Sequence, residues 1–311
     1  HEFKGSDARK FLDHVMAGKL PKPGRISLSP MLSYRGKLCG DLTVACLDEN
    51  EFMVFGSGAA QEMHRRWFES HLEKFNVNYK NRSDEFHGIS IAGPNSRKVL
   101  EKIVREDVSN EKFKFRDSKR MFVGGVPAII NRISFTGELG YEIYVAPHYQ
   151  IKLYEELMEA GREFNIKPFG GRALMSMRLE KNWGAWTLDY RPDFTAKETG
   201  LDMFINWDKD FIGKDFAQKD ESKNKLVPLI VETNDIDVTY NEAVLKGDKS
   251  IGYITSGGFA HFVNKSIAFS YVDQNELKSE KGIQVEINGD FFNCSIIKEP
   301  LYDPSGQKMR S

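Results

Sequence analysis

Polar and apolar residues alternate along several stretches of the first 145 residues, a pattern typical of strands buried on one face. The alternation is clear in residues 38–47, where Leu42 and Val44 fall on the same face. Between these stretches, apolar residues recur at helical spacing, as in residues 8–16. The predicted strands are 25–31, 38–47, 51–58, 86–92, a hairpin made of 121–130 and 132–135, and a glycine-containing loop and strand at 136–145; the predicted helices are 8–16, 59–75, 93–103, 148–161 and 171–183.

From residue 225 onward the pattern changes to short strands separated by turns that contain Gly, Asn and Asp. This pattern predicts a small all-β barrel or sandwich. The charged segment 214–225 is predicted to be a linker, with a surface helix followed by a loop. We therefore predict an α+β fold with two domains, 1–217 and 218–311, the second being a β-rich barrel domain. Its predicted strands are 227–231, 251–254, 266–272, 284–287 and 291–297.

Composition excludes several classes of protein. The 44 basic and 45 acidic residues leave a formal net charge of -1, which gives no broad electrostatic basis for binding nucleic acid or an anionic membrane. No run approaches the roughly 20 apolar residues that cross a bilayer, and no secretory signal is visible. Three cysteines without a C-x-x-C pair argue against a disulfide framework or structural zinc. A reducing compartment is predicted, namely the cytoplasm, or the mitochondrial matrix in a eukaryote.

Familiar catalytic signatures are missing. The seven histidines are scattered without H-E-x-x-H or comparable spacing, so no metal site is predicted. A G-x-S-x-G elbow, a Walker-type phosphate loop and a flavin or nicotinamide fingerprint are also absent from the sequence. The Gly56-Ser57-Gly58 corner could hold a phosphate at the start of the next helix. It lacks the full glycine spacing, so a tight turn is the favoured interpretation.

Three acids on predicted strands remain as candidates, Asp41, Glu138 and Glu142. Asp41 follows Gly40 in an otherwise apolar strand, where partial desolvation would favour proton or cation chemistry; the alternative is a simple turn residue. A buried carboxylate can pair with adjacent N–H donors of a heterocycle or stabilise a developing cationic nitrogen.

An irregular stretch after the last predicted helix of the first domain brings together Trp183, Trp186 and Tyr190. Core filling is the default role of such residues. The alternative is an aromatic edge to a ligand pocket.

The chain carries short motifs in the order FKGSDA (3–8), GRISLSPML (24–32), residues 36–44, IAGP (91–94), residues 134–144, RLEK (178–181), TSGG (255–258) and KSIA (265–268). With these motifs, essentially the whole chain resembles the folate-binding family of the glycine-cleavage aminomethyltransferase (T-protein). The similarity is greatest to the C-terminal module of dimethylglycine and sarcosine dehydrogenases. The resemblance implies two interleaved antiparallel sheet-plus-helix lobes and a barrel, arranged as a three-lobed ring around a central folate cavity.

The resemblance also implies roles for two of the candidate acids. Asp41 matches the family's catalytic acid, which lies beside the folate nitrogens that take up the one-carbon unit. The double acid common in aminomethyltransferases is here Gly40-Asp41, as in the dehydrogenase-type modules. Glu142 matches the glutamate that binds the pterin amide and amino group.

Further positions match the lining of the family's folate pocket. The aromatic residue at Phe135 is often tyrosine in relatives, so a hydroxyl contact made there is lost in this chain. Gly-Ala-Arg of the aminomethyltransferases is replaced around Arg172, which leaves that arginine without an assigned role. Thr43, Phe55 and Gly56 match pocket-lining positions, and Leu28 and Trp183 match such positions more loosely.

The function implied is capture, as 5,10-methylenetetrahydrofolate, of the carbon released by oxidative N-demethylation. Tetrahydrofolate is the expected cofactor, and FAD is expected only if an upstream domain supplies it. The expected partners are folate, the one-carbon unit of a methylated amine, and an upstream demethylating domain or chain. The start at His1 reads as the middle of an element, so we expect a fragment of a longer polypeptide.

Two alternative functions remain. The first is another folate-dependent donor reaction, as in a trimethylamine N-oxide or methylthio demethylase or the glycine-cleavage aminomethyltransferase itself. The second is a non-catalytic folate binder. Binders of this fold carry a cysteine in a K-G-C-Y-type motif, whereas residues 208–214 of this chain contain none.

Overall fold

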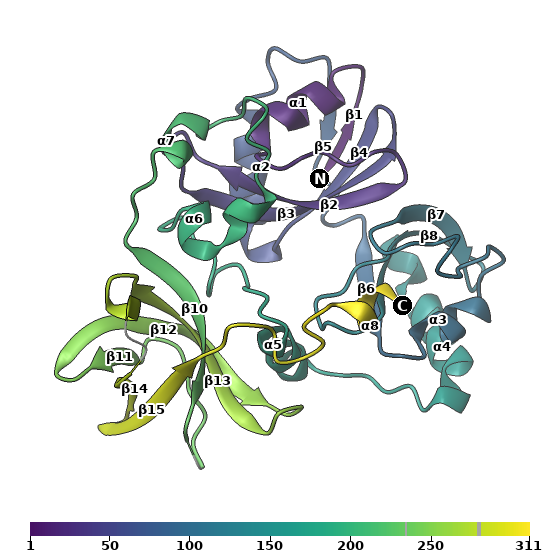
Figure 1. Ribbon diagram of the computed structural model, residues 1–311. Helices are drawn as coiled ribbons and strands as arrows, with labels where there is room; N and C mark the ends of the chain where they lie inside the picture. Colours follow the sequence, from purple (N-terminus) through teal and green to yellow (C-terminus); the bar gives the residue numbers. More distant parts are fainter. Residues whose placement is uncertain (234, 279–280) are drawn as a thin grey trace.

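The computed structural model describes residues 1–233, 235–278 and 281–311. Within these ranges the chain forms three lobes in a triangular arrangement (Figure 1), two with a helix-covered antiparallel sheet and one with a closed barrel. Residues 194–218 return to the first lobe after the second is complete, so the two sheet lobes are interleaved. This confirms the predicted α+β fold with a C-terminal barrel.

The first lobe is a five-stranded sheet with the strand order β2-β3-β4-β1-β5. Apolar side chains of β3 alternate toward one face, where they pack with Phe11 of α1 and Phe68 of α2. Both rings are fully buried. The elements are β1 (Glu2–Lys4), α1 (Ala8–Val15), β2 (Arg25–Leu32), β3 (Leu38–Asp48), β4 (Glu51–Phe55), η1 (Gly58–Ala60), α2 (Gln61–Glu69) and β5 (Asn78–Lys80).

The second lobe is a four-stranded sheet with the order β6-β9-β8-β7. The predicted hairpin at 121–135 is wrong in its turn, which lies between Val123 and Val126. Gly124 and Gly125 supply the two positive φ angles, 58° and 77°, that a two-residue turn requires. The elements are β6 (His87–Ala92), α3 (Ser96–Glu101), β7 (Ser118–Val123), β8 (Val126–Asn131), β9 (Gly140–Val145), η2 (Pro147–Tyr149), α4 (Gln150–Ala160) and η3 (Arg162–Phe164).

The third lobe closes into a barrel in the order β10-β13-β12-β11-β14-β15. Strand β11 was not predicted from the sequence, because it has four residues and little alternation; without it the barrel would not close. The elements are β10 (Asn224–Val231), β11 (Ala243–Lys246), β12 (Lys249–Ala260), β13 (Lys265–Asp273), η5 (Glu276–Lys278), β14 (Ile283–Ile287) and β15 (Asp290–Ile296).

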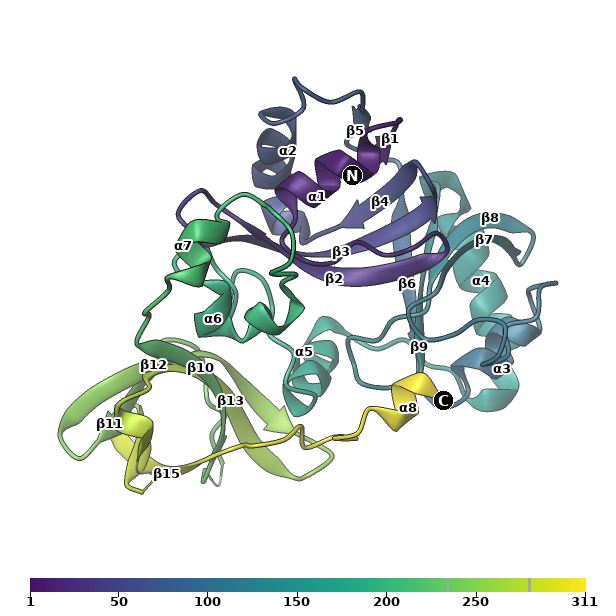
Figure 2. The same ribbon diagram turned by 45° about the horizontal axis from the view of Figure 1, so that its top comes forward.

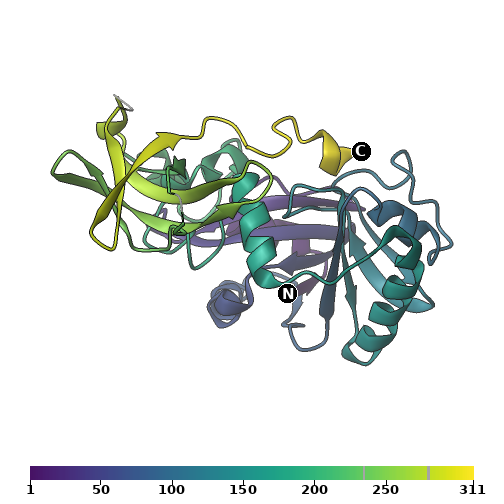
Figure 3. The same ribbon diagram turned by 90° about the horizontal axis from the view of Figure 1, so that it is seen from below.

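Connecting segments join the lobes. Helix α5 packs against β12 and β13 and lies between the barrel and the sheet lobes (Figure 3). After the barrel the chain passes α5, where the Tyr302 N–H donates to the Glu180 carbonyl (3.0 Å), and reaches α8 beside the second lobe (Figure 2). None of the helices in the described ranges is long and apolar enough to cross a membrane. These elements are α5 (Gly171–Glu180), α6 (Ala196–Thr199), η4 (Leu201–Phe204), α7 (Lys214–Gln218) and α8 (Gln307–Arg310).

Candidate functional site

A cavity of about 370 Å³ lies between the two sheet lobes, the returning segment and α8. Strands β2 and β3 form one wall, and β9 with the loop before it forms another. The remaining lining comes from Phe115 and Arg116 before β7, from residues 183–204 and from α8. Its surface is mostly apolar, and the acids on it are Asp41 and Glu142. An apolar cavity with a few convergent polar groups is the usual form of a small-molecule site.

The cavity brings together most of the residues predicted from the sequence. Phe55 and Gly56 instead line an adjacent hollow of about 280 Å³. Phe55 is nevertheless the cross-strand partner of Thr43, so the two regions are next to each other in the sheet. The predicted residues that line the larger cavity are Leu28, Asp41, Thr43, Phe135, Glu142 and Trp183.

Asp41 lies on β3 opposite Pro30 of β2, the edge strand of its sheet. Burial raises the pKa of the Asp41 carboxyl to about 7, and a hydrogen bond within the residue partly opposes this shift. No cation of the described residues pairs with this carboxyl. Asp41 is therefore close to half-ionised at neutral pH, which suits a group that exchanges protons.

His64 of α2 lies behind the strand that carries Asp41. Its Nε2 is 3.0 Å from the Cys39 carbonyl oxygen and donates to it, and burial lowers the His64 pKa to about 4, so the ring is neutral. A Cβ at Gly40 would lie 2.8 Å from Nε2, and a Cβ at Gly56 would lie 2.9 Å from Nδ1. The imidazole therefore requires glycine at both positions, which gives Gly56 a packing role.

Glu142 projects from β9 into the opposite side of the cavity. The Tyr144 hydroxyl donates a hydrogen bond to Oε2 of Glu142 (2.7 Å), and the Tyr144 ring stacks on Phe55 with 4.3 Å between centroids. Burial raises the pKa of Glu142, while the bond from Tyr144 lowers it. Oε1 of Glu142 accepts nothing from the described residues, so it is available to a ligand.

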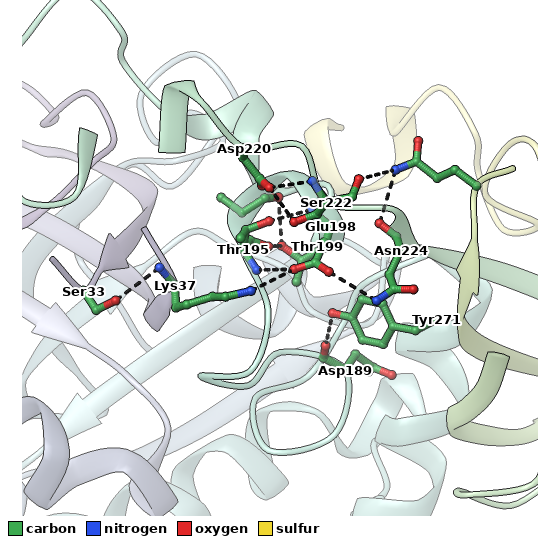
Figure 4. A network of polar contacts seen from close by, with 12 residues as sticks. Ser33, Lys37, Asp189, Thr195, Glu198, Thr199, Asp220, Ser222, Asn224 and Tyr271 are labelled. Atoms are coloured by element: carbon green, nitrogen blue, oxygen red, sulfur yellow. Dashed lines mark hydrogen bonds and ion pairs between the residues drawn. The ribbon is translucent and has the colours of Figure 1, made fainter. Parts of the chain in front are cut away.

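A buried ionic network fixes the loop that follows α5. The Arg178 guanidinium pairs with the Asp189 carboxylate, and both side chains are almost completely buried. Thr255 and Ser256 of β12 donate to the other Asp189 oxygen, at 2.5 and 2.6 Å. The Tyr271 hydroxyl of β13 donates to the Asp189 carbonyl (2.7 Å; Figure 4). Asp189 thus ties this cavity-lining loop to the barrel.

A second network holds the returning segment (Figure 4). Thr195 and Glu198 form a reciprocal capping box at the start of α6, with bonds of 2.8 and 3.2 Å. The Glu198 carboxylate also pairs with Lys37 of the first lobe (3.4 Å) and accepts from Asn224 of the barrel (3.5 Å). This carboxylate joins residues 194–218 to both the first lobe and the barrel.

The cavity is also lined by polar side chains that were not predicted as site residues, among them Arg116, Tyr190 and Arg310. The two arginines are exposed at the rim, and Arg116 has a left-handed backbone (φ 69°) that no sequence pattern indicates for arginine. Tyr190 belongs to the aromatic stretch that had two interpretations, and both apply to it: it packs in a core cluster with Leu38 and Leu201, and it lines the cavity. The cavity therefore combines two inner carboxyls with two outer guanidinium groups.

This arrangement suits a flat ligand with N–H donors and an anionic end. Desolvated carboxyls without counter-cations bind N–H donors strongly, and rim guanidinium groups attract carboxylates. Among the described residues, no three His, Cys, Asp or Glu side chains converge to hold a metal ion.

Two protein-family models match this chain, one for the sheet lobes and one for the barrel. The family model for the GCVT N-terminal domain matches residues 1–209, and the model for the glycine cleavage T-protein C-terminal barrel domain matches residues 224–303. Mitochondrial dimethylglycine dehydrogenase of Homo sapiens is 37% identical over 306 residues, which cover 96% of this chain and 35% of that protein. The chain therefore spans about a third of the length of the dimethylglycine dehydrogenases it matches.

Shorter relatives match over most of their length. An aminomethyltransferase of Desulfitobacterium hafniense (strain Y51) is 30% identical over 311 residues, covering 98% of this chain and 84% of that protein. The crystal structure of glycine cleavage system aminomethyltransferase T from Bartonella henselae has the same fold, with a TM-score of 0.86 at 22% identity over 97% of this chain and 83% of that one. The chain belongs to the glycine cleavage T-protein family of aminomethyltransferases.

Proposed function

We propose that this chain is a tetrahydrofolate-dependent one-carbon transfer module. It captures the carbon released by oxidative N-demethylation of a dimethylglycine or sarcosine type of substrate as 5,10-methylenetetrahydrofolate. The observation that carries this proposal is the pair of desolvated carboxyls, Asp41 and Glu142, in one apolar cavity without a cationic partner among the described residues.

The lining fits a reduced pterin. Leu28, Phe135 and Trp183 supply apolar surface for a flat ring, and the free Oε1 of Glu142 faces the same space. An ionised Glu142 that accepts two parallel N–H bonds from the ring gains about 1.5–3 kcal/mol per bond. The bond from Tyr144 orients the Glu142 carboxylate and keeps its second oxygen in place.

Asp41 is the proposed catalytic residue. Tetrahydrofolate, when bound, supplies the two nitrogens that take up the one-carbon unit. With a pKa of about 7, Asp41 can accept a proton from a ligand nitrogen at neutral pH, and its ionised form stabilises adjacent positive charge in a poorly solvated cavity. Arg116 and Arg310 at the rim are proposed to attract the carboxylates of the glutamate tail.

The identity of the one-carbon donor rests on the relatives. Greater identity to the dimethylglycine dehydrogenases supports a methylated amine as the donor, with FAD, if used, supplied by another domain. Coverage of 84% of several aminomethyltransferases supports the glycine-cleavage reaction as the second candidate. A cytoplasmic or mitochondrial-matrix location remains part of the proposal.

We also propose a domain boundary at residues 217/218. The first matching family model ends at residue 209 and the second begins at residue 224. The proposed boundary lies between them, close to the end of α7. The first domain would then carry the folate site, and the barrel would support the loop that contains Asp189.

The test of the proposed function uses Asp41→Asn. We expect the affinity for tetrahydrofolate, measured by calorimetry, to stay within about tenfold of wild type. The rate of methylenetetrahydrofolate formation from limiting formaldehyde, above the reaction without protein, should fall at least about 100-fold. Asp84→Asn, which changes an exposed acid, is the matched control. Failure of the wild type to bind tetrahydrofolate, or an unchanged rate in Asp41→Asn, would contradict the proposal.

A further inference from the structure

Tyr190 is a buried tyrosine that has no role in the proposed proton transfer or in the binding of the pterin by Glu142. Its side chain lines the cavity together with Asp41 and is only 7% exposed. Its hydroxyl oxygen accepts a hydrogen bond from the Gly184 N–H (3.2 Å). A phenolic hydroxyl both accepts and donates, so this bond leaves its hydrogen to be donated elsewhere.

The hydroxyl hydrogen of Tyr190 has no acceptor in the described part of the chain. In its hydrogen bond with the described residues, the hydroxyl oxygen is the acceptor. Buried polar hydrogens are normally paired, because an unpaired one costs roughly 1–3 kcal/mol. Since the residue lines a cavity, a ligand in that cavity can provide the missing acceptor.

The position of the ring is fixed by a specific contact. A Cβ at residue 184 would lie 2.3 Å from Cζ and 2.6 Å from the hydroxyl oxygen of Tyr190, so only glycine allows the ring to lie there. The neighbouring Asp189 is fixed by its ion pair with Arg178 and by the bond from Tyr271. The hydroxyl is therefore held in one place before any ligand binds, which reduces the entropy cost of the contact.

The environment keeps this hydroxyl protonated. Burial is the main cause that raises the Tyr190 pKa above its ordinary value, and the nearby Asp41 carboxylate raises it further. The phenol is thus a hydrogen-bond donor over the whole physiological pH range.

We propose that Tyr190 is a ligand-binding residue of this site and donates its hydroxyl hydrogen to an acceptor atom of the bound folate, on the side of the cavity that holds Asp41. This inference rests on the proposed folate site. When ionised, the Asp41 and Glu142 carboxylates can only accept hydrogen bonds, and Tyr190 adds a donor to them. Gly184 supports this role in two ways. It has no Cβ to clash with the Tyr190 ring, and its N–H donates to the hydroxyl oxygen, which leaves the hydroxyl hydrogen for the ligand.

The test measures tetrahydrofolate binding to the full chain by calorimetry in wild type, Tyr190→Phe and a control, Tyr271→Phe. The control removes a buried hydroxyl that holds the same loop from the barrel side, outside the cavity. We expect Tyr190→Phe to weaken binding about two- to tenfold, the usual value of one neutral hydrogen bond, and Tyr271→Phe to remain within twofold of wild type.

Two results would overturn the inference while leaving the proposed function intact: unchanged binding in Tyr190→Phe, or equal losses in both variants, which would indicate loop displacement. Failure of the wild type to bind would instead refute the folate site itself. If Tyr190→Phe does not fold, crystals of the wild type soaked with tetrahydrofolate decide the question. A ligand oxygen or nitrogen within about 3.5 Å of the Tyr190 hydroxyl supports the inference, and its absence refutes it.

Discussion

Replacing Asp41 by Asn should make the protein more stable at alkaline pH, although the same change should abolish transfer activity. In the folded protein the Asp41 pKa is raised from 3.8 to about 7 by burial. Between these two values the folded state holds a proton that the unfolded chain has released. The free energy of unfolding of the wild type therefore falls as the pH rises through this window. Asparagine carries no charge and does not incur this loss.

The size of the effect follows from the shift. The shift of about 3 pKa units corresponds to about 4 kcal/mol at pH 8, above the window, and to about 1.5 kcal/mol at pH 5, within it. The free energy of unfolding of Asp41→Asn, relative to that of the wild type, should therefore rise by about 2.5 kcal/mol between pH 5 and pH 8. Asp41 is partly exposed, so solvent screens part of this difference and we expect a growth of about 1–2.5 kcal/mol.

Urea unfolding followed by tryptophan fluorescence at pH 5, 6, 7 and 8 measures this growth. Asp84→Asn is the control, because it makes the same side-chain change at an exposed position outside the cavity. A stability difference for Asp41→Asn that stays constant from pH 5 to 8 would refute the desolvation of Asp41, and with it the basis for its catalytic assignment.

Three further predictions concern Glu142 and the buried Arg178–Asp189 pair. Glu142→Ala should weaken tetrahydrofolate binding by about 2 kcal/mol or more in calorimetry, and an unchanged isotherm would remove the pterin assignment. Because burial raises the Glu142 pKa and ligand N–H donors favour its ionised form, binding at acidic pH should release protons; binding heats that do not vary with the buffer would contradict this. Asp189→Asn leaves the Arg178 charge buried without its partner and should cost about 3–5 kcal/mol in denaturant unfolding, whereas a loss below about 1 kcal/mol would show that the pair is unimportant.

Strand alternation explains why the sequence predicted much of the fold. Each sheet has one buried face, so the period-two pattern of β3 appears directly in the residues. The turn of the β7–β8 hairpin was misplaced because apolar residues continue on both sides of Gly124, and only the conformation of the glycine pair interrupts them. The short β11 carries too few residues to produce a readable period.

The candidate site was predictable only in part. Asp41 and Glu142 could be selected because an acid within an apolar strand is unusual, and the motif order linked them. Tyr190 could not be assigned, because a core aromatic and a pocket aromatic have the same local pattern; the difference lies in the Gly184 contact and in the cavity. Arg116 enters the cavity through a left-handed turn that depends on tertiary contacts rather than on local sequence.

The central claim is that a reduced pterin binds between Asp41 and Glu142. A crystal structure of the protein soaked with tetrahydrofolate tests it most directly. We expect the pterin ring in the cavity beside Trp183, with ring N–H groups about 3 Å from the Glu142 carboxylate and the nitrogens that accept the one-carbon unit facing Asp41. Folate bound elsewhere, or a ring directed away from both carboxyls, would contradict it.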